Sequence, residues 1–230
     1  MKIKINSELN GLPGFLYKRA VRRLAKSYSP YHPIFLGDER IGEGERACID
    51  RWAIIAGNLR ATGAKTLLDL GCAEGYFVQQ AAKSGCLAVG VDADVLRLSL
   101  AQASATLNRV QGAGFIYAEL TPEFIDTLPP YDAVLFLSVL HHIMYEQGID
   151  YARQYMRRLK PKVGKFMIFD MAQSNETGHA WASLLPDMGD DPHAWIAEFL
   201  SSAGFRSIEK VGDTDAYQGS VRRALFRVAP

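Results

Sequence analysis

Two carboxylates follow short apolar runs in the first half of the chain. Asp69 lies at the end of the run TLLDL and precedes a glycine turn, and Asp92 ends the run LAVGVD about 20 residues later. A carboxylate at the end of the second strand can accept hydrogen bonds from both hydroxyls of a ribose. The spacing therefore predicts a site for an adenine nucleoside.

The turn between these carboxylates indicates the charge of the ligand. Gly71 and Gly75 would let the backbone approach a ligand closely, but the residues between them are Cys72, Ala73 and Glu74. The middle glycine of the dinucleotide fingerprint G-x-G-x-x-G is missing, and Glu74 would repel a diphosphate. A cationic ligand would be attracted instead, and S-adenosylmethionine (SAM) combines adenosine with a sulfonium and an ammonium group.

The adjacent histidines His141 and His142 are candidates for a general base, because histidine titrates near neutral pH. A purely structural role, with one ring partly buried and the other on a surface loop, is the alternative. A metal site is disfavoured because no E-x-x-E-H arrangement accompanies the pair. The cysteines Cys48, Cys72 and Cys86 lack the C-x-x-C spacing of a zinc site.

The elements that must position these residues alternate between strand and helix. Short apolar runs bounded by Gly, Pro or Asp predict strands, and the longer segments between them have helical periodicity. Such alternation predicts an α/β fold with a doubly wound, mainly parallel sheet and helices on both faces. The predicted strands are 66–70, 87–92, 114–119, 131–138, 165–171, about 205–211 and about 220–228, the last two forming an antiparallel edge; the predicted helices are 75–84, 95–109, 121–127, 148–159 and one opened by DDP at 190–192.

Four motifs occur in one order: DLGCAEGYF, GVDAD, YDAVLFLSVLHHI and LKPKVGKFMI. In this order and spacing they resemble the motifs of class I (seven-β-strand, Rossmann-like) SAM-dependent methyltransferases. The resemblance is strong over residues 64–170 and looser over 195–205 and the last two strands. It implies a methyltransferase that binds SAM, releases S-adenosylhomocysteine and has a seven-stranded sheet.

The resemblance also implies a role for individual residues. Asp69, Gly71 and Gly75 would shape the pocket for the methionine part of SAM, and Asp92 would hold the ribose. The remaining implied cofactor residues are Cys72, Ala73 and Glu74 in the loop, Ala93, Ala118 and Glu119 around adenine, and Ser138 after the fourth strand. His141 and His142 are the catalytic candidates. Ala73 departs from the family pattern, in which many members have glycine there.

The first 62 residues are predicted to form a helical extension before a methyltransferase domain of residues 63–230. It contains a basic amphipathic helix over about 13–28, the segment 29–44 read as a loop, and a second helix over about 45–60. Three roles for residues 13–28 stay open: docking on the domain by the apolar side, peripheral contact with a membrane, and, less favoured, binding of nucleic acid.

Two segments could cover the mouth of the SAM pocket and select the acceptor. One is 29–44 with the following helix, and the other is the long link 172–191, which contains His179 and Trp181. The expected acceptor is a small molecule or a lipid- or glycan-linked intermediate. An RNA methyltransferase and a non-catalytic nucleotide-binding module are the alternatives.

Composition sets the outer limits of this interpretation. The 230 residues are 48% hydrophobic and 22% charged, with a formal net charge of +1; disorder and fibrous structure are excluded. Three cysteines suit a reducing compartment, and the chain is expected to be cytoplasmic, with possible contact to the inner face of a membrane. The charge is uneven, because residues 1–28 contain seven Lys or Arg and one Asp or Glu.

Overall fold

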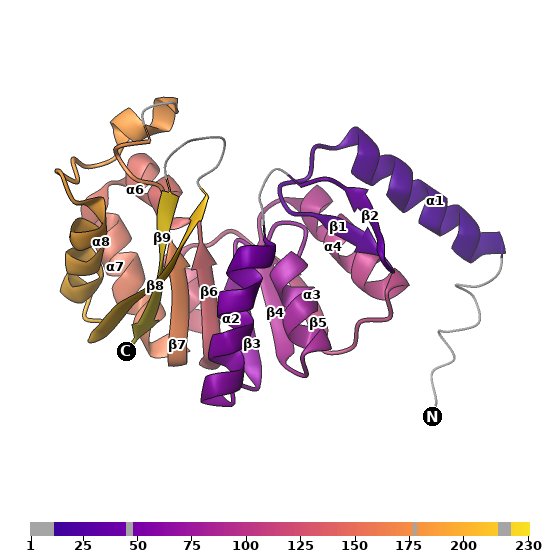
Figure 1. Ribbon diagram of the computed structural model, residues 1–230, viewed down its shortest axis with the longest axis horizontal. Coiled ribbons are helices and arrows are strands. Elements are labelled where there is room, and N and C mark those ends of the chain that lie inside the picture. Colours follow the sequence, from indigo (N-terminus) through magenta and orange to yellow (C-terminus); the bar gives the residue numbers. More distant parts are fainter. Residues whose placement is uncertain (1–11, 45–47, 177–178, 216–221) are drawn as a thin grey trace.

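A seven-stranded sheet forms the centre of the molecule, in a computed structural model that describes residues 12–44, 48–176, 179–215 and 222–230 (Figure 1). The strand order is β5-β4-β3-β6-β7-β9-β8. The first five of these strands are parallel to one another, and β9 is antiparallel to both of its neighbours. The strands are β3 (Thr66–Leu70), β4 (Leu87–Asp92), β5 (Ala113–Tyr117), β6 (Tyr131–Leu137), β7 (Val163–Asp170), β8 (Ser207–Asp215) and β9 (Arg222–Ala229).

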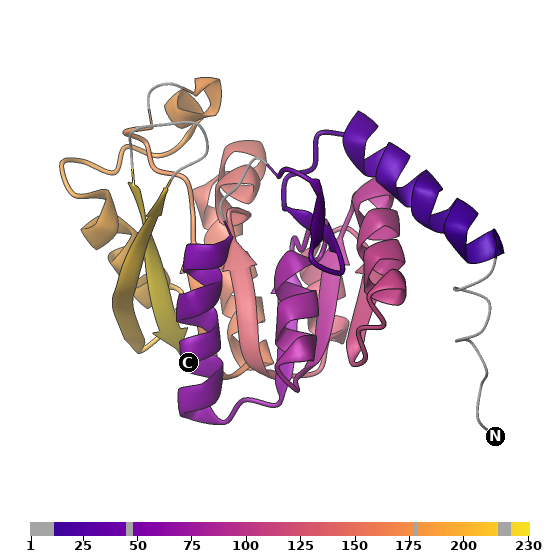
Figure 2. The same ribbon diagram turned by 45° about the vertical axis from the view of Figure 1, so that its right-hand side comes forward.

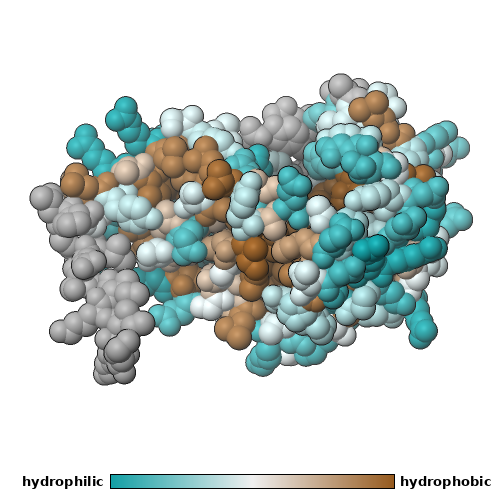
Figure 3. Space-filling model, turned by 180° about the vertical axis from the view of Figure 1, so that it is seen from behind, coloured by the Kyte–Doolittle hydropathy of each residue, from teal (hydrophilic) through white to brown (hydrophobic). Residues whose placement is uncertain are grey.

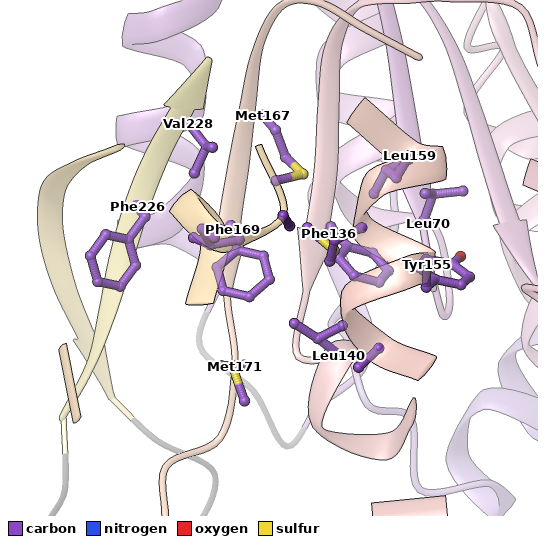
Figure 4. Close-up of a cluster of buried hydrophobic side chains, with 14 of the residues drawn as sticks. Leu70, Phe136, Leu140, Tyr155, Leu159, Met167, Phe169, Met171, Phe226 and Val228 are labelled. Atoms are coloured by element: carbon purple, nitrogen blue, oxygen red, sulfur yellow. The ribbon is translucent and has the colours of Figure 1, made fainter. Parts of the chain in front are cut away.

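The two faces of the sheet bury separate apolar clusters. The helices α2 (Ile49–Thr62), α3 (Tyr76–Lys83) and α4 (Val95–Leu107) pack on one face. The other face is covered by α5 (Pro122–Thr127), α6 (Leu140–Gln147), α7 (Ile149–Leu159) and α8 (Pro192–Ser202). Figure 4 shows part of this second cluster, where Phe136 of β6 stacks on Tyr155 of α7. Burial on both faces explains why the central strands are continuous apolar runs.

Helix α7 shows how the outer surface stays polar. It buries Tyr155, Met156 and Leu159 in the core and exposes Arg157 and Arg158. Seen from behind, hydrophilic side chains gather over the half of the molecule that contains α7 and α8 (Figure 3). This side therefore follows the ordinary amphipathic pattern of a surface helix.

The segment 29–44 is not the plain loop that the sequence analysis expected. It forms an antiparallel hairpin of β1 (Ile34–Leu36) and β2 (Glu39–Gly42), joined by a two-residue turn at Gly37 and Asp38. Gly37 has a φ of 62°, which suits such a turn. The prediction was wrong because proline and glycine density hid Ile34 and Ile41, whose side chains are buried against α4.

The basic helix α1 (Leu12–Ser27) lies outside the sheet layers, beside the hairpin and α4 (Figures 1 and 2). Val21 and Ala25 pack against Leu100 and Ala103 of α4. Among the described residues, no helix is both long enough and apolar enough to cross a membrane.

The other predicted elements are present, with ends displaced by a few residues. Helix α6 was not predicted, since its eight residues continue directly into α7 across Gly148. Short 3₁₀ turns occupy Lys160–Lys162 and Ala180–Leu184. The predicted second helix corresponds to α2, and residues 45–47 of that prediction lie outside the described residues. The division into units 1–62 and 63–230 stays a prediction.

Candidate functional site

A cleft opens over the carboxyl ends of β3, β4 and β6, where ligands bind in doubly wound sheets. It consists of two adjoining hollows of about 510 and 400 Å³ that share Gly71, Asp92 and His142. The first hollow is also lined by Tyr31, Ala73, Arg97, Leu137, Ser138, Val139, His141, Trp181 and Arg223. The second is also lined by Ala93, Glu119, Leu120, Thr121, Ile143, Glu146, Gln147 and Tyr151.

Eight of the predicted site residues line this cleft: Gly71, Ala73, Asp92, Ala93, Glu119, Ser138, His141 and His142. The remaining five, which are Asp69, Cys72, Glu74, Gly75 and Ala118, line neither hollow of the described structure. The structure thus brings the ends of four strands together as expected. It also places part of the glycine turn beneath the surface of the cleft rather than in it.

Asp92 organises the turn after β3. Its carboxylate accepts hydrogen bonds from the backbone N–H groups of Ala73 at 2.8 Å and Asp94 at 2.9 Å. Ala73 has a φ of 47°, so the alanine adopts a backbone conformation that glycine adopts more readily. At Gly71, with a φ of 80°, a Cβ atom would lie only 2.5 Å from Val139 Cγ2. The turn is therefore held in a single tight shape facing the cleft.

Asp69 lies one residue before the end of β3 and is buried. Its Oδ2 atom has no hydrogen-bond partner among the described residues. Burial raises the pKa of Asp69 to about 8, with a further rise from the charge of Asp92 and an opposing effect from Arg51. A buried carboxyl group whose acceptor oxygen lacks a hydrogen-bond partner strongly favours a positive charge beside it.

Glu74 does not line the cleft, although the sequence analysis expected it among the cofactor-binding residues of the turn. Its buried carboxylate accepts hydrogen bonds from the backbone N–H groups of Tyr31 at 3.0 Å and His32 at 2.7 Å. Desolvation raises its pKa, and these two hydrogen bonds oppose the rise. Glu74 therefore fastens the segment before the hairpin over the cleft, with Tyr31 in the cleft wall.

Cys72, Gly75 and Ala118 support the turn from below. The Cys72 side chain is buried against Gly90. A Cβ atom at Gly90 would lie only 2.6 Å from the Cys72 Sγ, so only glycine leaves room for this side chain. A Cβ atom at Gly75 would collide with the Phe115 ring, so glycine permits close packing of α3 on β5. Ala118 donates its backbone N–H to the Asp92 carbonyl at 3.1 Å. In this structure these residues contribute packing and backbone geometry.

The two histidines differ in environment. His141 is buried, and its Nδ1 accepts a hydrogen bond from the Ala172 backbone N–H at 3.3 Å. His142 lies in both hollows, with Nδ1 at 2.6 Å from the Tyr145 hydroxyl. Desolvation lowers the pKa of His142, with Glu146 opposing and Arg223 adding to the decrease. His142 is thus neutral near pH 7 and faces the space where an acceptor would lose a proton.

The described parts of the link after β7, residues 171–176 and 179–191, form a lid over the first hollow. Glu176 and Arg223 make a buried two-pronged ion pair, with both N···O distances at 2.7 Å. Arg223 also donates to the Ser138 hydroxyl at 3.2 Å, and Ser138 donates to Asp170 at 2.8 Å. This network fixes the lid to the carboxyl ends of β6, β7 and the start of β9.

The lid brings an aromatic surface to the cleft. Trp181 lines the first hollow and lies 5.5 Å from the ring of His141, between ring centroids. His179 stacks on Trp181 with centroids 4.9 Å apart, and the Arg223 guanidinium lies over the same indole. The sequence analysis named His179 and Trp181 in this link, and the structure places Trp181 in the wall of the first hollow.

Comparison with known proteins agrees with this arrangement. The family described as "Methyltransferase domain" matches residues 68–164. The O-antigen chain terminator bifunctional methyltransferase/kinase WbdD of Escherichia coli is 31% identical over 206 residues, which cover 86% of this chain and 27% of WbdD. A crystal structure of WbdD superposes with a TM-score of 0.77 at 28% identity, over 91% of this chain and 46% of that one. This chain carries a class I methyltransferase domain.

A second solved methyltransferase shows the same fold. Magnesium protoporphyrin IX methyltransferase from Synechocystis PCC 6803, solved with bound SAM, has a TM-score of 0.57 at 23% identity, over 79% of each chain. At this level of identity the likeness is one of fold. The chain spans about a quarter of the length of the two matching WbdD sequences and about half of the crystallised WbdD chain.

The residues of the methyltransferase cleft fit SAM. The Asp92 carboxylate lies where the two hollows meet, as a ribose between adenine and methionine requires. Leu120 and Ile143 give the second hollow apolar surface for a flat base. The open oxygen of Asp69 beneath the turn favours the cationic part of the cofactor.

Sequence reasoning missed two arginines of the methyltransferase cleft. Arg97, in the first turns of α4, lies over the Tyr31 ring at 5.6 Å and donates to the Tyr28 hydroxyl at 3.0 Å. Arg223 lies at the start of the final strand RRALFRVA and is buried there, and an arginine next to the apolar run of a strand is a signal that could have been used. In the described residues, no group of three or more His, Cys, Asp or Glu side chains could hold a metal ion.

Proposed function

We propose that this protein transfers the methyl group of SAM to a glycan, or to a small or lipid-linked molecule that carries a sugar. The observation that carries this proposal is the wall of the first hollow, where the aromatic side chains of Tyr31 and Trp181 lie among Arg97, Arg223 and His142. A flat aromatic face covers the apolar side of a sugar ring, and surrounding polar groups bind its hydroxyls.

The relative WbdD supports the same class of acceptor. Its name describes it as a terminator of O-antigen chains, which are glycans, and its likeness extends over most of this chain. The kinase activity in that name is not carried over to this chain.

The cofactor residues follow from the cleft. Asp92 would accept hydrogen bonds from the ribose hydroxyls, with Ala93 and Glu119 beside the adenine. Gly71, Ala73 and Ser138 would border the methionine part. Asp69 would act through the electrostatic potential under the turn, because it does not line the cleft.

SAM supplies a methyl group on a sulfonium, which leaves as the neutral thioether of S-adenosylhomocysteine. The acceptor atom forms the new bond to the methyl carbon and loses its proton to His142, which is neutral near pH 7 and is hydrogen-bonded to the Tyr145 hydroxyl. The lid anchored by Glu176 and Arg223 excludes water and holds the acceptor in line. Because the leaving group is already activated, positioning supplies much of the rate.

The cofactor half of the proposal is tested by calorimetric titration with SAM and S-adenosylhomocysteine. We expect both to bind, and we expect Asp92→Ala to weaken binding at least roughly tenfold through lost ribose hydrogen bonds and a loosened turn. Asp126→Ala on α5, an exposed carboxylate remote from the cleft, is the matched control. Unchanged affinity in Asp92→Ala would remove Asp92 from the site.

The acceptor half is tested with SAM labelled in the methyl group. Separated glycan, lipid-linked glycan, RNA and protein fractions of a cell extract are each incubated with the enzyme. We expect label in a glycan-containing fraction, a loss of transfer in Trp181→Ala with SAM affinity retained, and a large decrease in His142→Gln. Label confined to RNA or protein would refute the glycan assignment.

A further inference from the structure

The outer face of α1 is a surface that the cleft does not use. It consists of the apolar residues Phe15, Leu16 and Leu24 and the basic residues Arg19, Arg23 and Lys26, all of which are exposed. The exposed fractions of Phe15 and Leu16 are 59% and 54%. Large apolar side chains so exposed, in a group and among cations, indicate an interaction surface.

Docking of α1 on the domain leaves this face uncovered. The opposite side of the helix is buried through Gly14, Val21 and Ala25, and the latter two pack on α4. In both views α1 lies at the periphery of the molecule, on the far side of α4 from the centre of the sheet (Figures 1 and 2). The apolar stripe predicted from the sequence is therefore satisfied by α4, while Phe15 and Leu16 form a second apolar group.

The charge around this face is predominantly positive. The helix sequence LPGFLYKRAVRRLAKS contains five Lys or Arg and no Asp or Glu. Along its inner edge a hollow of about 470 Å³ adds Lys83 and Arg109 to Lys18 and Arg22. Asp38 also lines this hollow, and Arg22 is paired with Glu39 at 2.6 Å, so the cations remain in excess.

The combination of exposed apolar and basic side chains on α1 limits which kinds of partner can bind there. A second copy of the chain meeting the same face would set cations against cations. A nucleic acid would pair with the arginines but would leave Leu16 and Leu24 beside phosphates. A bilayer with anionic headgroups satisfies both halves of the surface at once, because the cations contact headgroups and the apolar side chains enter the acyl boundary.

We propose that the outer face of α1 binds the surface of an anionic lipid membrane, with Phe15, Leu16 and Leu24 inserted and Arg19, Arg23 and Lys26 on the headgroups. The helix lies in the plane of the interface and does not span the bilayer.

The helix is connected to the cleft at its other end. Tyr28, just after α1, donates its hydroxyl to Asp94 at 3.1 Å and accepts a hydrogen bond from Arg97, which lines the first hollow. The end of α1 is thus connected to the wall of the first hollow through Tyr28 and Arg97. The consequence that the acceptor is lipid-linked rests on the proposed function, whereas membrane binding itself does not.

The test is co-sedimentation of the full chain with vesicles of phosphatidylcholine alone and of phosphatidylcholine with phosphatidylglycerol. We expect binding only to the anionic vesicles, decreasing with salt. The double variant Arg19→Glu/Arg23→Glu should weaken binding by at least roughly tenfold, given about fivefold for each basic side chain at an anionic surface. Phe15→Ser/Leu16→Ser should weaken it by at least roughly tenfold through lost apolar insertion.

Matched variants elsewhere separate this surface from general charge or hydrophobicity. Arg60→Glu/Arg206→Glu removes two exposed arginines from other parts of the surface, and Ile49→Ser removes an isoleucine that is 72% exposed at the start of α2. Both controls should bind vesicles as the wild type does. All variants should bind SAM normally, which shows that they are folded independently of any transfer activity.

Three results would overturn the proposal. The first is no sedimentation with anionic vesicles, and the second is binding that the α1 variants leave unchanged. The third is self-association or tRNA binding, measured by ultracentrifugation and gel shift, that disappears in the α1 variants while vesicle binding is absent.

Discussion

At the scale of single residues, Asp69 shows how the fold sets the chemistry of the turn. A carboxyl group with an ordinary pKa near 3.9 is buried near the end of a strand, and one of its oxygens has no hydrogen-bond partner among the described residues. Its pKa rises to about 8, chiefly through desolvation. The protein thus holds a neutral acid at pH 7 that a bound cation would help to ionise.

Asp69 predicts a specific dependence of stability on pH. Because the folded pKa lies above the unfolded pKa, the native state retains a proton that the unfolded chain releases between about pH 4 and pH 8. The contribution of Asp69 to the free energy of unfolding is fully present below about pH 4 and is lost as the pH rises through 8. Urea unfolding without SAM should show this decline, and Asp69→Asn should flatten it.

Asp132 is a control for Asp69, because its pKa is shifted in the opposite direction. Hydrogen bonds from the backbone N–H groups of Lys65 and Thr66 lower its pKa despite opposing desolvation, so its stabilisation is lost as the pH falls. Asp132→Asn should alter the acid limb alone. A decline near pH 8 that persists in Asp69→Asn would assign the effect to another group.

The residue scale also shows where sequence reasoning is strong. Asp92, Gly71 and His142 could be placed because each lies at the carboxyl end of a buried strand or shortly after it, and all parallel strands end at one edge of the sheet. The position of the neighbouring Glu74 could not be predicted, because its hydrogen-bond partners are backbone N–H groups about 40 residues earlier in the chain. A partner distant in sequence leaves no local pattern.

At the scale of elements, the lid is anchored by one ion pair. Glu176 and Arg223 are each buried, and removing one partner would leave a buried charge without compensation. Desolvation lowers the pKa of Arg223, but the Glu176 hydrogen bond and the charges of Asp170 and Glu176 outweigh it and raise the pKa.

We expect Glu176→Gln to destabilise the protein by about 3 kcal/mol, measured by chemical unfolding. The same variant should increase the KM for the acceptor more than the Kd for SAM, because the lid carries Trp181 and the residues proposed to contact SAM lie at the strand ends. Arg158→Ala, which removes an exposed ion pair with Asp126, should change stability by less than about 1 kcal/mol. Equal effects on both ligands would place Glu176 in the cofactor site.

The hairpin β1–β2 and helix α6 mark the limit of pattern reading for elements. Strands of three and four residues have too few positions to show alternation, and their pairing depends on burial against α4. The longer parallel strands could be predicted because burial on both faces makes them continuously apolar.

At the scale of the whole molecule, α1 ties the basic N-terminal region to an otherwise more acidic chain. The contact depends on Val21 and Ala25 against α4, and on the Tyr28 hydrogen bonds to Asp94 and Arg97. One face of the helix therefore belongs to the domain while the other remains available to a partner.

Val21→Asp should release α1 from the domain, since it places an unpaired charge in a site that is 5% exposed, at a cost of about 3 kcal/mol. Limited digestion with trypsin should then cut at the arginines of α1 much faster than in the wild type. Ala20→Asp, on the exposed side of the same turn, is the matched control and should digest at nearly the wild-type rate. Equal protection in both variants would show that α1 docks by other contacts.

The sequence by itself determined the mainly parallel sheet, its antiparallel edge and the residues at the carboxyl ends of its strands. Those features depend on apolar periodicity and on the rule that ligands bind at the carboxyl ends of such strands. Only the tertiary structure decided that Glu74 fastens the entrance segment, that Arg223 anchors the lid, and which side of α1 stays exposed. The roles of Glu74 and Arg223 depend on contacts between residues that are distant in the chain. The exposed side of α1 depends on which of its apolar and basic residues the neighbouring elements cover.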